Sequence, residues 1–443
     1  MTVLIGGAAI VLAACGATAD ESGAASDTGA AQSPESSGTT SGDTPDDASG
    51  PAAADADRSV EPGAGSRGGV VVEVEQIESS EREDVPSGLD DYPIAVDELP
   101  ELARLRSGGP PPDGIPAVDS PVFYSAESVD YLGPNDPVVA LEIDGDARAY
   151  PLEVMVWHEI VNDTVGGVPV AVAYCPLCNS VTVFDRRIED RVLDFGTSGL
   201  LFNSSLVMFD RQTETLWSHF AGRPLYGELG EAELVDYPAT IVGFETWRES
   251  NPDGLVLSPE TGHDRPYGQN PYPGYDDVDR EPFLFEGEVD GRYTAMTRVV
   301  GVSTGDAEGS DGGAAAALAF PLLDLREAGV MTGDLDGEDV VAFWVPGSSS
   351  ALDSAIVSEG VDVGATGVFV PAVDGRSLTF ESTDGVISDV ETGSTWDIFG
   401  MATSGELAGS SLEQLVHIDT FWFAWIAFHP DSEVGGEGLD SAG

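Results

Sequence analysis

Two of the three cysteines, Cys175 and Cys178, lie in the stretch AYCPLCNS with two residues between them. A C-P-x-C turn between two strands can direct both sulfurs to one side, where they reach one another or a common metal ion. Four interpretations are open: half of a metal knuckle, a redox pair, a nucleophile beside a second thiol, or two buried thiols that only fill space.

A metal site needs further ligands, because no second C-x-x-C occurs in the chain. His158 and His219 are the histidines nearest in sequence, so the predicted ligand set is Cys175, Cys178, His158 and His219. Two thiolates and two imidazoles suit zinc, and the same soft ligands suit copper. The residues expected to support this set are Glu159, Trp157, Asp185, Arg211 and Trp217.

The same residues allow two other chemistries. An extracellular compartment is oxidising, so Cys175 and Cys178 can close a redox or structural disulfide. Cys175 could instead act as a nucleophile, with His158 or His219 as its base and Glu159 or Asp163 orienting that base. The sequence places the pair between two strands and not at a helix start, which favours a metal over a dithiol enzyme.

An internal repeat distinguishes the residues that the fold requires, which occur in both copies, from residues that occur in one copy only. Residues 149–176 align without gaps on residues 319–346, and DRQTETLW (210–217) is echoed by DVETGSTW (389–396). Apolar and turn positions persist in both copies, which predicts a tandem duplication over residues 120–270 and 280–432.

The residues able to do chemistry occur only in the first copy. The pairs of first-copy and second-copy residues are His158/Ala328, Glu159/Gly329, Cys175/Val345, Cys178/Ser348 and His219/Ile398. The fold therefore manages this turn without thiols, and the second copy is expected to complete the core or one wall of the site.

Short segments rich in Val and aromatic residues predict a mainly β, α+β fold. The predicted strands are 138–143, 147–152, 169–174, 180–185, 205–210 and 239–244, and the predicted helices are 152–156 and 246–250. FGTSGLLFNSS (195–205) is predicted as a plain loop in preference to a tight turn that lines the site. The Tyr- and Pro-rich stretch 264–275 is predicted as a linker over both cores in preference to a rigid aromatic loop for a ligand.

The net charge of −61 is spread over the whole 443-residue chain, and all 18 cationic side chains are Arg. Such charge is tolerated where salt screens it, so we interpret it as adaptation to a salt-rich habitat. Nucleic acid is not an expected partner, because the chain has no basic patch. Arg186, Arg187 and Arg211 are expected to pair with nearby Asp, and His417 and His429 to be core or edge residues.

The amino terminus predicts export. Residues 1–15 combine a short apolar run with Leu12-Ala13-Ala14-Cys15, which resembles a lipoprotein signal with Cys15 as the lipidated residue. Residues 16–69 are poor in apolar side chains and predict a disordered tether, residues 70–119 an N-terminal extension, and residues 433–443 a disordered tail. The expected location is the cell surface, with the membrane as a partner through the lipid.

Several long motifs resemble one family. AYPLEVMVWHEIVND, VPVAVAYCPLCNSVTVFDR, TGHDRPYGQNPYPGY and the closing HIDTFWFAWIAFHPD are similar to the DUF3179 family of bacteria and archaea. The resemblance covers about residues 120–432. It implies a secreted or membrane-attached protein and no particular activity, so the predicted function is a cell-surface lipoprotein that binds zinc or copper. The alternatives are an interaction module with a Cys175–Cys178 disulfide and a thiol-dependent enzyme using Cys175.

Overall fold

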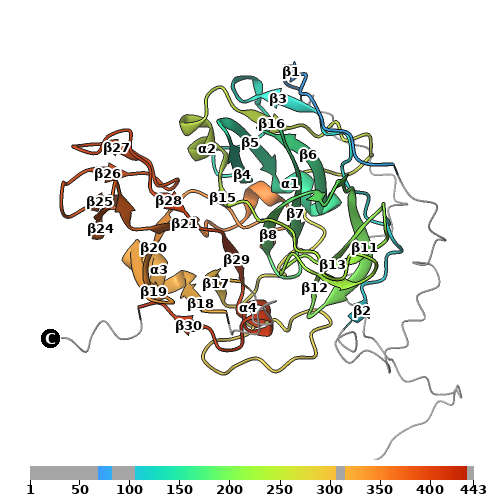
Figure 1. Cartoon of the computed structure of the whole chain (residues 1–443). Helices are drawn as coiled ribbons and strands as arrows, with labels where there is room; N and C mark the ends of the chain where they lie inside the picture. The colour runs from blue at the N-terminus through green and yellow to red at the C-terminus, as the bar shows by residue number, and fades with distance from the viewer. Residues whose placement is uncertain (1–67, 82–104, 306–314, 437–443) are drawn as a thin grey trace, which may run out of the picture. The chain divides into compact units, whose positions relative to one another are not determined.

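The computed structural model describes residues 68–81, 105–305 and 315–436 (Figure 1). Within these ranges strands dominate, so the predicted α+β, mainly β class is confirmed. Each α-helix in these ranges has seven residues, too short to be stable alone. The helices are α1 (Leu152–His158), α2 (Phe244–Ser250), α3 (Leu322–Ala328) and α4 (Trp422–Phe428).

The first sheet recurs with the same strand order in both halves of the chain. In the first half the order is β15 (Thr240–Gly243), β4 (Pro137–Ile143), β5 (Asp146–Pro151), β16 (Leu255–Leu257), β3 (Phe123–Ser125) and β1 (Val71–Val72). In the second half it is β29 (His417–Phe421), β17 (Arg298–Ser303), β18 (Ala317–Pro321) and β30 (Glu433–Val434). In each half a short last strand runs parallel to its neighbour, β16 to β5 and β30 to β18.

A meander of antiparallel strands follows the first helix of each half. It consists of β6 (Ile160–Val165), β7 (Val168–Cys175) and β8 (Ser180–Asp185) in the first half. The second half has β19 (Val330–Leu335), β20 (Glu338–Val345), β21 (Ala365–Val370) and the added β28 (Glu413–Gln414). All residues of β6, β7 and β8 are buried, and β7, the central strand, accordingly carries an unbroken apolar run.

A third sheet follows the meander in each half. The first contains β14 (Pro224–Tyr226), β13 (Leu216–Ser218), β12 (Ser205–Asp210), β11 (Phe195–Phe202) and β2 (Leu105–Ser107). The second contains β24 (Phe380–Thr383), β25 (Val386–Asp389), β26 (Thr395–Trp396) and β27 (Ala402–Ser404). Two-stranded ribbons precede these sheets: β9 (Arg187–Ile188) with β10 (Arg191–Val192), and β22 (Ala372–Val373) with β23 (Arg376–Ser377).

A buried aspartate closes the same turn in each third sheet. The carboxylate of Asp210 accepts the indole N–H of Trp217 at 3.0 Å, and Asp389 accepts that of Trp396 at 3.0 Å. The backbone N–H of the residue three positions after each aspartate donates to it at 2.6 Å. The echo between DRQTETLW and DVETGSTW is therefore a requirement of the fold, since each buried donor needs this acceptor.

The two halves contact one another through β29 of the second half and β15 of the first. In β29, the N–H of Phe421 donates to the carbonyl of Cys178, beside β8. In β15, the hydroxyl of Thr240 donates to the carbonyl of Thr366 in β21. Aromatic side chains of α4 also enter the core of the first half, where Phe428 stacks on Phe220 with ring centroids 4.4 Å apart. Each half thus buries part of the other (Figure 1).

Two predictions about segments were wrong. Residues 195–202, predicted as a loop, form β11, whose Gly and Ser residues accommodate a bulge between Thr197 and Leu200. Residues 433–434, predicted as part of a disordered tail, form β30, the counterpart of β16. The predicted signal with Cys15 and nearly all of the predicted tether lie outside the described residues.

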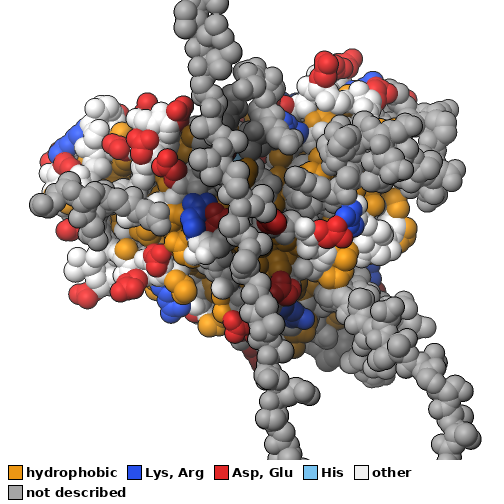
Figure 2. All heavy atoms as spheres, turned by 90° about the horizontal axis from the view of Figure 1, so that it is seen from below, with side chains coloured by type: hydrophobic (Ala, Val, Ile, Leu, Met, Phe, Trp, Pro, Cys, Tyr) orange, Lys and Arg blue, Asp and Glu red, His pale blue; other side chains and the backbone are white. Residues whose placement is uncertain are grey.

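Among the described helices, none combines the length and apolar character needed to cross a bilayer. Figure 2 shows acidic side chains scattered across one face of the molecule, with apolar side chains between them. This distribution fits the sequence, in which the acidic residues run through the folded segments as well as the terminal ones.

We expect Asp210→Ala and Asp389→Ala each to lower the free energy of unfolding by about 2–3 kcal/mol, because each leaves several buried donors unpaired. Denaturant unfolding in molar salt would measure both. Removing a negative charge relieves repulsion in so acidic a chain, so a stabilised variant would contradict the structural role of the turn.

Candidate functional site

The turn that carries both cysteines is enclosed on all sides. Cys175 ends β7 and pairs with Ser180, the first residue of β8, so Pro176–Asn179 form the connection. The hydroxyl of Thr420 donates to the carbonyl of Cys178 at 2.7 Å, and the phenol of Tyr275 donates to the carbonyl of Leu177 at 3.0 Å. A buried loop needs such partners for its carbonyls, and here the second half of the chain and the 264–275 stretch supply them.

Both thiols are buried and free, and polar groups from three segments contact them. Cys175 and Cys178 are 1% and 0% exposed, and no disulfide joins them. Cys178 Sγ lies 2.9 Å from Ser180 Oγ and 3.5 Å from Ser205 Oγ. The backbone N–H of Leu206 donates to Cys175 Sγ at 3.4 Å. The first two residues of β12 therefore bring one wall of the site.

The surroundings shift the pKa values of the two thiols in opposite directions. Burial raises the pKa of Cys175 well above its ordinary value, and the hydrogen bond and charge of Cys178 add to this. Burial alone would also raise the pKa of Cys178, but hydrogen bonds from Cys175, Ser180 and Ser205 lower it overall. Cys178 is therefore the more acidic thiol of the pair, and its ionised form would accept a hydrogen bond from the Cys175 thiol.

His219 reaches Cys178 through a hydroxyl. Its Nε2 lies 2.9 Å from Ser180 Oγ, and its Nδ1 lies 3.0 Å from Thr182 Oγ1. Burial lowers the pKa of His219 to about 3, so the ring is neutral, with one donor and one acceptor. When Nε2–H donates to Ser180, the Ser180 hydroxyl is free to donate to the Cys178 thiolate. The ring thus favours the ionised form of Cys178.

Glu159 lies beside the end of β7, where its carbonyl accepts from the backbone N–H of Tyr174 at 2.7 Å. It follows α1 and is 7% exposed, and burial first, then the charge of Cys175, raise its pKa well above the ordinary value. Tyr272 lies near both groups. Burial first, and then the charges of Glu159 and Cys175, raise the pKa of its phenol well above the ordinary value.

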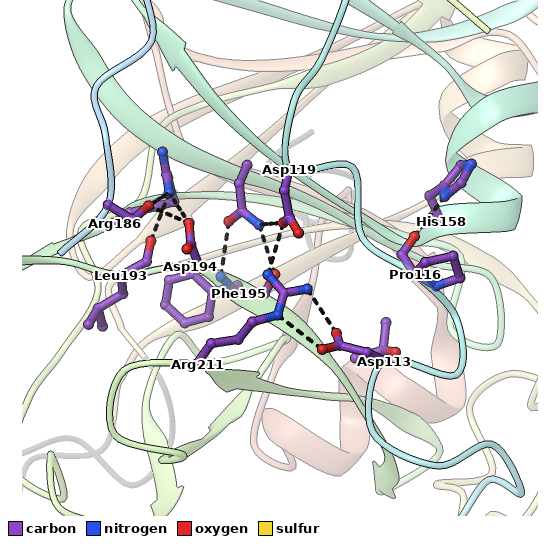
Figure 3. A network of polar contacts seen from close by, with 12 residues as sticks. Asp113, Pro116, Asp119, His158, Arg186, Leu193, Asp194, Phe195 and Arg211 are labelled. Carbon is purple, nitrogen blue, oxygen red and sulfur yellow. Dashed lines mark hydrogen bonds and ion pairs between the residues drawn. The ribbon is translucent and has the colours of Figure 1, made fainter. Parts of the chain in front are cut away.

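His158 does not join the thiols. Its Nδ1 lies 2.7 Å from the carbonyl of Pro116, and its Nε2 lies 2.6 Å from the phenol of Tyr267. A carbonyl only accepts, so Nδ1 donates and Nε2 accepts from Tyr267. Burial, then the charges of His263 and Arg265, lower the pKa of His158 to about 4. Figure 3 shows the ring directed at Pro116.

The other residues expected to support the site serve the fold. Asp185 pairs with Arg187, and the indole of Trp157 donates to the carbonyl of Gln269. Arg211 forms a bidentate pair with Asp113 and also contacts Asp119, which holds the segment before β3 against β11 and β12 (Figure 3). Trp217 donates to Asp210, as described above.

The expected pairing of Arg186, Arg187 and Arg211 with nearby Asp is confirmed. Arg186 pairs with Asp194, Arg187 with Asp185 and Arg211 with Asp113. His417 and His429 are 4% and 5% exposed, as expected for core residues.

The predicted ligand set is therefore not assembled as a whole. Three of its members, Cys175, Cys178 and His219, lie in one hydrogen-bonded network, and His158 lies outside it. Within residues 68–81, 105–305 and 315–436, no group of three or more His, Cys, Asp or Glu side chains is placed to hold a metal ion. Zinc or copper binding stays a prediction.

Sequence reasoning missed Ser180 and Ser205, and it gave Tyr272 only as part of a ligand loop, the less favoured interpretation of residues 264–275. Ser180 aligns with Ser350 of the second half, so the repeat gives no signal for it. Ser205 belongs to a stretch that reads as an ordinary polar turn, and Tyr272 to a stretch interpreted as a linker. Their roles follow only from the packing around the turn.

Comparison with known proteins gives one match. The model of the family described as "Protein of unknown function (DUF3179)" matches residues 112–432. Neither the curated proteins nor the solved structures contain a match to this chain.

We expect His219→Gln to weaken the acid sensitivity of the fold. The unfolded chain takes up a proton at His219 near pH 6.5 but the folded chain only near pH 3, so this residue makes stability fall as the pH falls between those values. The variant should lose about 1.4 kcal/mol per pH unit from the slope of the unfolding free energy.

Denaturant titrations in molar salt from pH 7.5 to 4 would measure this slope for both chains. At pH 7.5 the His219 ring is neutral in the folded and the unfolded chain. The difference in unfolding free energy between the variant and the natural chain at this pH therefore reports packing alone and serves as the control. Parallel curves for the variant and the natural chain would contradict a buried neutral His219.

Proposed function

The chain belongs to the DUF3179 family, whose function is unknown, and we propose from the site alone that Cys175 and Cys178 form a redox-active dithiol. The observation that carries the proposal is the difference between the two thiols: Cys178 contacts the hydroxyls of Ser180 and Ser205 and has a lowered pKa, whereas burial raises the pKa of Cys175. Thiol–disulfide chemistry needs this combination of a nucleophilic sulfur and a neighbouring sulfur that resolves the intermediate.

The burial of the pair limits its oxidant to a small molecule. A disulfide on another protein cannot reach sulfurs that are 1% and 0% exposed. A cleft between the two halves, wide enough for a water molecule, is lined by Asn179, the residue after Cys178, and by Arg298 and Asp419. Hydrogen peroxide is close to water in size and polarity, so a peroxide is the oxidant class that suits this site.

The reaction proceeds in two balanced steps. The Cys178 thiolate attacks one peroxide oxygen, the O–O bond breaks, and the departing hydroxide takes a proton to become water, which leaves a sulfenic acid on Cys178. Cys175 then loses its proton and attacks the Cys178 sulfur. The S–O bond breaks, and the second hydroxide leaves as water. Two thiols and one peroxide give one disulfide and two waters, and a dithiol reductant returns two electrons and two protons.

A chain carrying Cys15→Ser contains only the pair, so its thiols can be counted directly. We expect two titratable thiols after unfolding of the reduced protein, none after peroxide treatment, and both again after reduction. Cys175→Ser should stop at a sulfenic acid on Cys178 that a dione reagent traps. Thiols that survive peroxide in the folded chain would overturn the proposal.

Metal binding is the alternative for the same sulfurs, and the same preparation tests it. Elemental analysis that finds about one zinc or copper per chain, lost in Cys175→Ser, would favour the metal over the redox pair. The hydrogen bonds that already occupy both nitrogens of His158 and of His219 argue against it.

We also propose that the chain is exported and held at the cell surface by a lipid on Cys15, with acidic composition suited to high salt. The apolar run before Cys15 and the low apolar content of residues 16–67 support this arrangement. Cys15→Ser should move the protein from the membrane fraction to the soluble fraction of its host. An unchanged membrane fraction would contradict lipid anchoring at this residue.

A further inference from the structure

The strands β6 and β19 occupy the same place in the two halves. β6 follows Glu159, whose φ is 60°, and β19 follows Gly329, whose φ is 72°. This left-handed backbone makes the same turn out of α1 and out of α3, and it suits glycine better than glutamate. The carbonyl of each residue accepts from the neighbouring strand, from Tyr174 at 2.7 Å and from Trp344 at 2.9 Å. β6 and β19 can therefore be compared residue by residue.

In the first half both outer strands of the meander have a further partner. Val118 pairs in parallel with β6: its N–H donates to the carbonyl of Ile160, and its carbonyl accepts from the N–H of Asn162, each at 2.9 Å. At the opposite edge, the N–H of Asp185 in β8 donates to the carbonyl of Val235 at 2.8 Å. Extended segments before β3 and before β15 thus cover both edges of this sheet.

The outer edge of β19 has no such partner. β19 is an end strand of its sheet (Figure 1), and Val330 and Thr332 stand where β6 has Ile160 and Asn162. The pairing groups of these two residues therefore face away from β20. Nothing in the described ranges accepts from the N–H of Thr332 or donates to the carbonyl of Val330.

β19 also lacks the features that keep an edge strand from pairing with another chain. Such features are charged residues, prolines, bulges and very short strands. β19 has six residues, pairs with β20 without a break in register, and carries no charge or proline from Val330 to Gly333. Val330 and Met331 are half-buried, so apolar surface accompanies the unpaired backbone groups. An extended segment can add to this edge, as Val118 adds to β6.

The turn from β19 to β20 is acidic, in contrast to its counterpart. Its exposed side chains include Asp334, Asp336, Glu338 and Asp339, and the four corresponding residues of the first half are uncharged. In molar salt the Debye length is about 3 Å, so charges interact only at close range. A ligand that this turn selects therefore brings its cations directly beside β19.

The two faces of β19 differ, which fixes the pattern of a matching segment. Because side chains alternate along a strand, Thr332 and Asp334 lie on one face and Met331 on the other. Met331 packs against the core of the second half, whereas Asp334 is exposed. In an added strand, every second side chain would lie beside the acidic turn, and the others would lie over Met331.

We propose that the outer edge of β19 binds an extended segment of another protein in which Arg or Lys alternates with apolar residues. The segment adds a strand to the sheet and pairs with the N–H of Thr332 and the carbonyl of Val330. Its cations lie beside Asp334 and Asp336, and its apolar side chains cover Met331. A second copy of this chain is a poorer partner, because it carries the same acidic turn and a net charge of −61.

The test measures the Kd of a dye-labelled peptide in which Val and Arg alternate, by fluorescence anisotropy in molar salt. The protein is the full chain carrying Cys15→Ser. A peptide in which Val and Glu alternate is the control, and we expect it to bind at least roughly tenfold more weakly, since like charges meet at the turn. Equal affinities, or no binding of the Val and Arg peptide, would overturn the proposal.

Two substitutions of one residue separate the backbone edge from the surface around it. Thr332→Pro removes only an outward N–H, which an edge strand tolerates, and it should weaken binding about tenfold. Thr332→Ala keeps the N–H and should bind as the natural chain does. Unfolding midpoints of both variants show whether they fold. Full affinity in a folded Thr332→Pro chain would refute strand addition.

Hydrogen exchange tests the edge without any substitution. The Val and Arg peptide should slow amide exchange in residues 330–335 of the natural chain. Exchange in residues 160–165, the equivalent strand that is already covered, should not change. Unaltered exchange at 330–335 on a chain that binds the peptide would place the peptide elsewhere and contradict the proposal.

The acidic turn and self-association are tested separately. Asp336→Asn combined with Glu338→Gln should weaken binding of the Val and Arg peptide roughly two- to fivefold, as expected for exposed ion pairs. Unchanged affinity would refute the charge preference. A chain that dimerises without peptide, and becomes monomeric with Thr332→Pro in sedimentation, would assign the edge to a second copy and overturn the proposed partner.

Discussion

The burial of the turn between β7 and β8 is the constraint on which the rest of the site depends. A turn exposes its carbonyls, and water normally satisfies them. Here Thr420, Phe421 and Tyr275 take that role, so the second half of the chain must pack on the first before the turn can close. The same enclosure removes water from both sulfurs. Their acidities then depend on a few hydroxyls and on one another, which is how two adjacent thiols become chemically different.

The duplication divides the residues by purpose without any other sequence. Asp210 and Asp389 make the same hydrogen bonds in both halves and belong to the fold. The thiols, His219 and Glu159 occur only in the first half, and the structure accommodates Val345, Ser348 and Gly329 at the corresponding positions. The second half has none of these side chains, but its β29 and α4 pack in the core around the cysteines.

Periodicity and composition predicted most of the fold. The strands 180–185 and 205–210 have the predicted bounds, since buried runs between turn residues leave little choice. β11 was missed because its glycines resemble a loop, and only its pairing with β12 identifies it. The site was predicted in part. Spacing identified the thiols, and the repeat identified His219, but His158 faces Pro116 and Tyr267, segments 42 and 109 residues away that sequence spacing cannot place.

Glu159 explains why the two halves cannot be interchangeable. A left-handed glutamate costs about 1–2 kcal/mol, and burying its carboxyl costs more. A single β-rich unit of this size has little stability to spare. Stability gained at the exchanged interface, where each half covers the meander of the other, offsets this cost. A duplicated fold can therefore hold strain in one half while the other keeps glycine, and the cysteine turn lies at that interface.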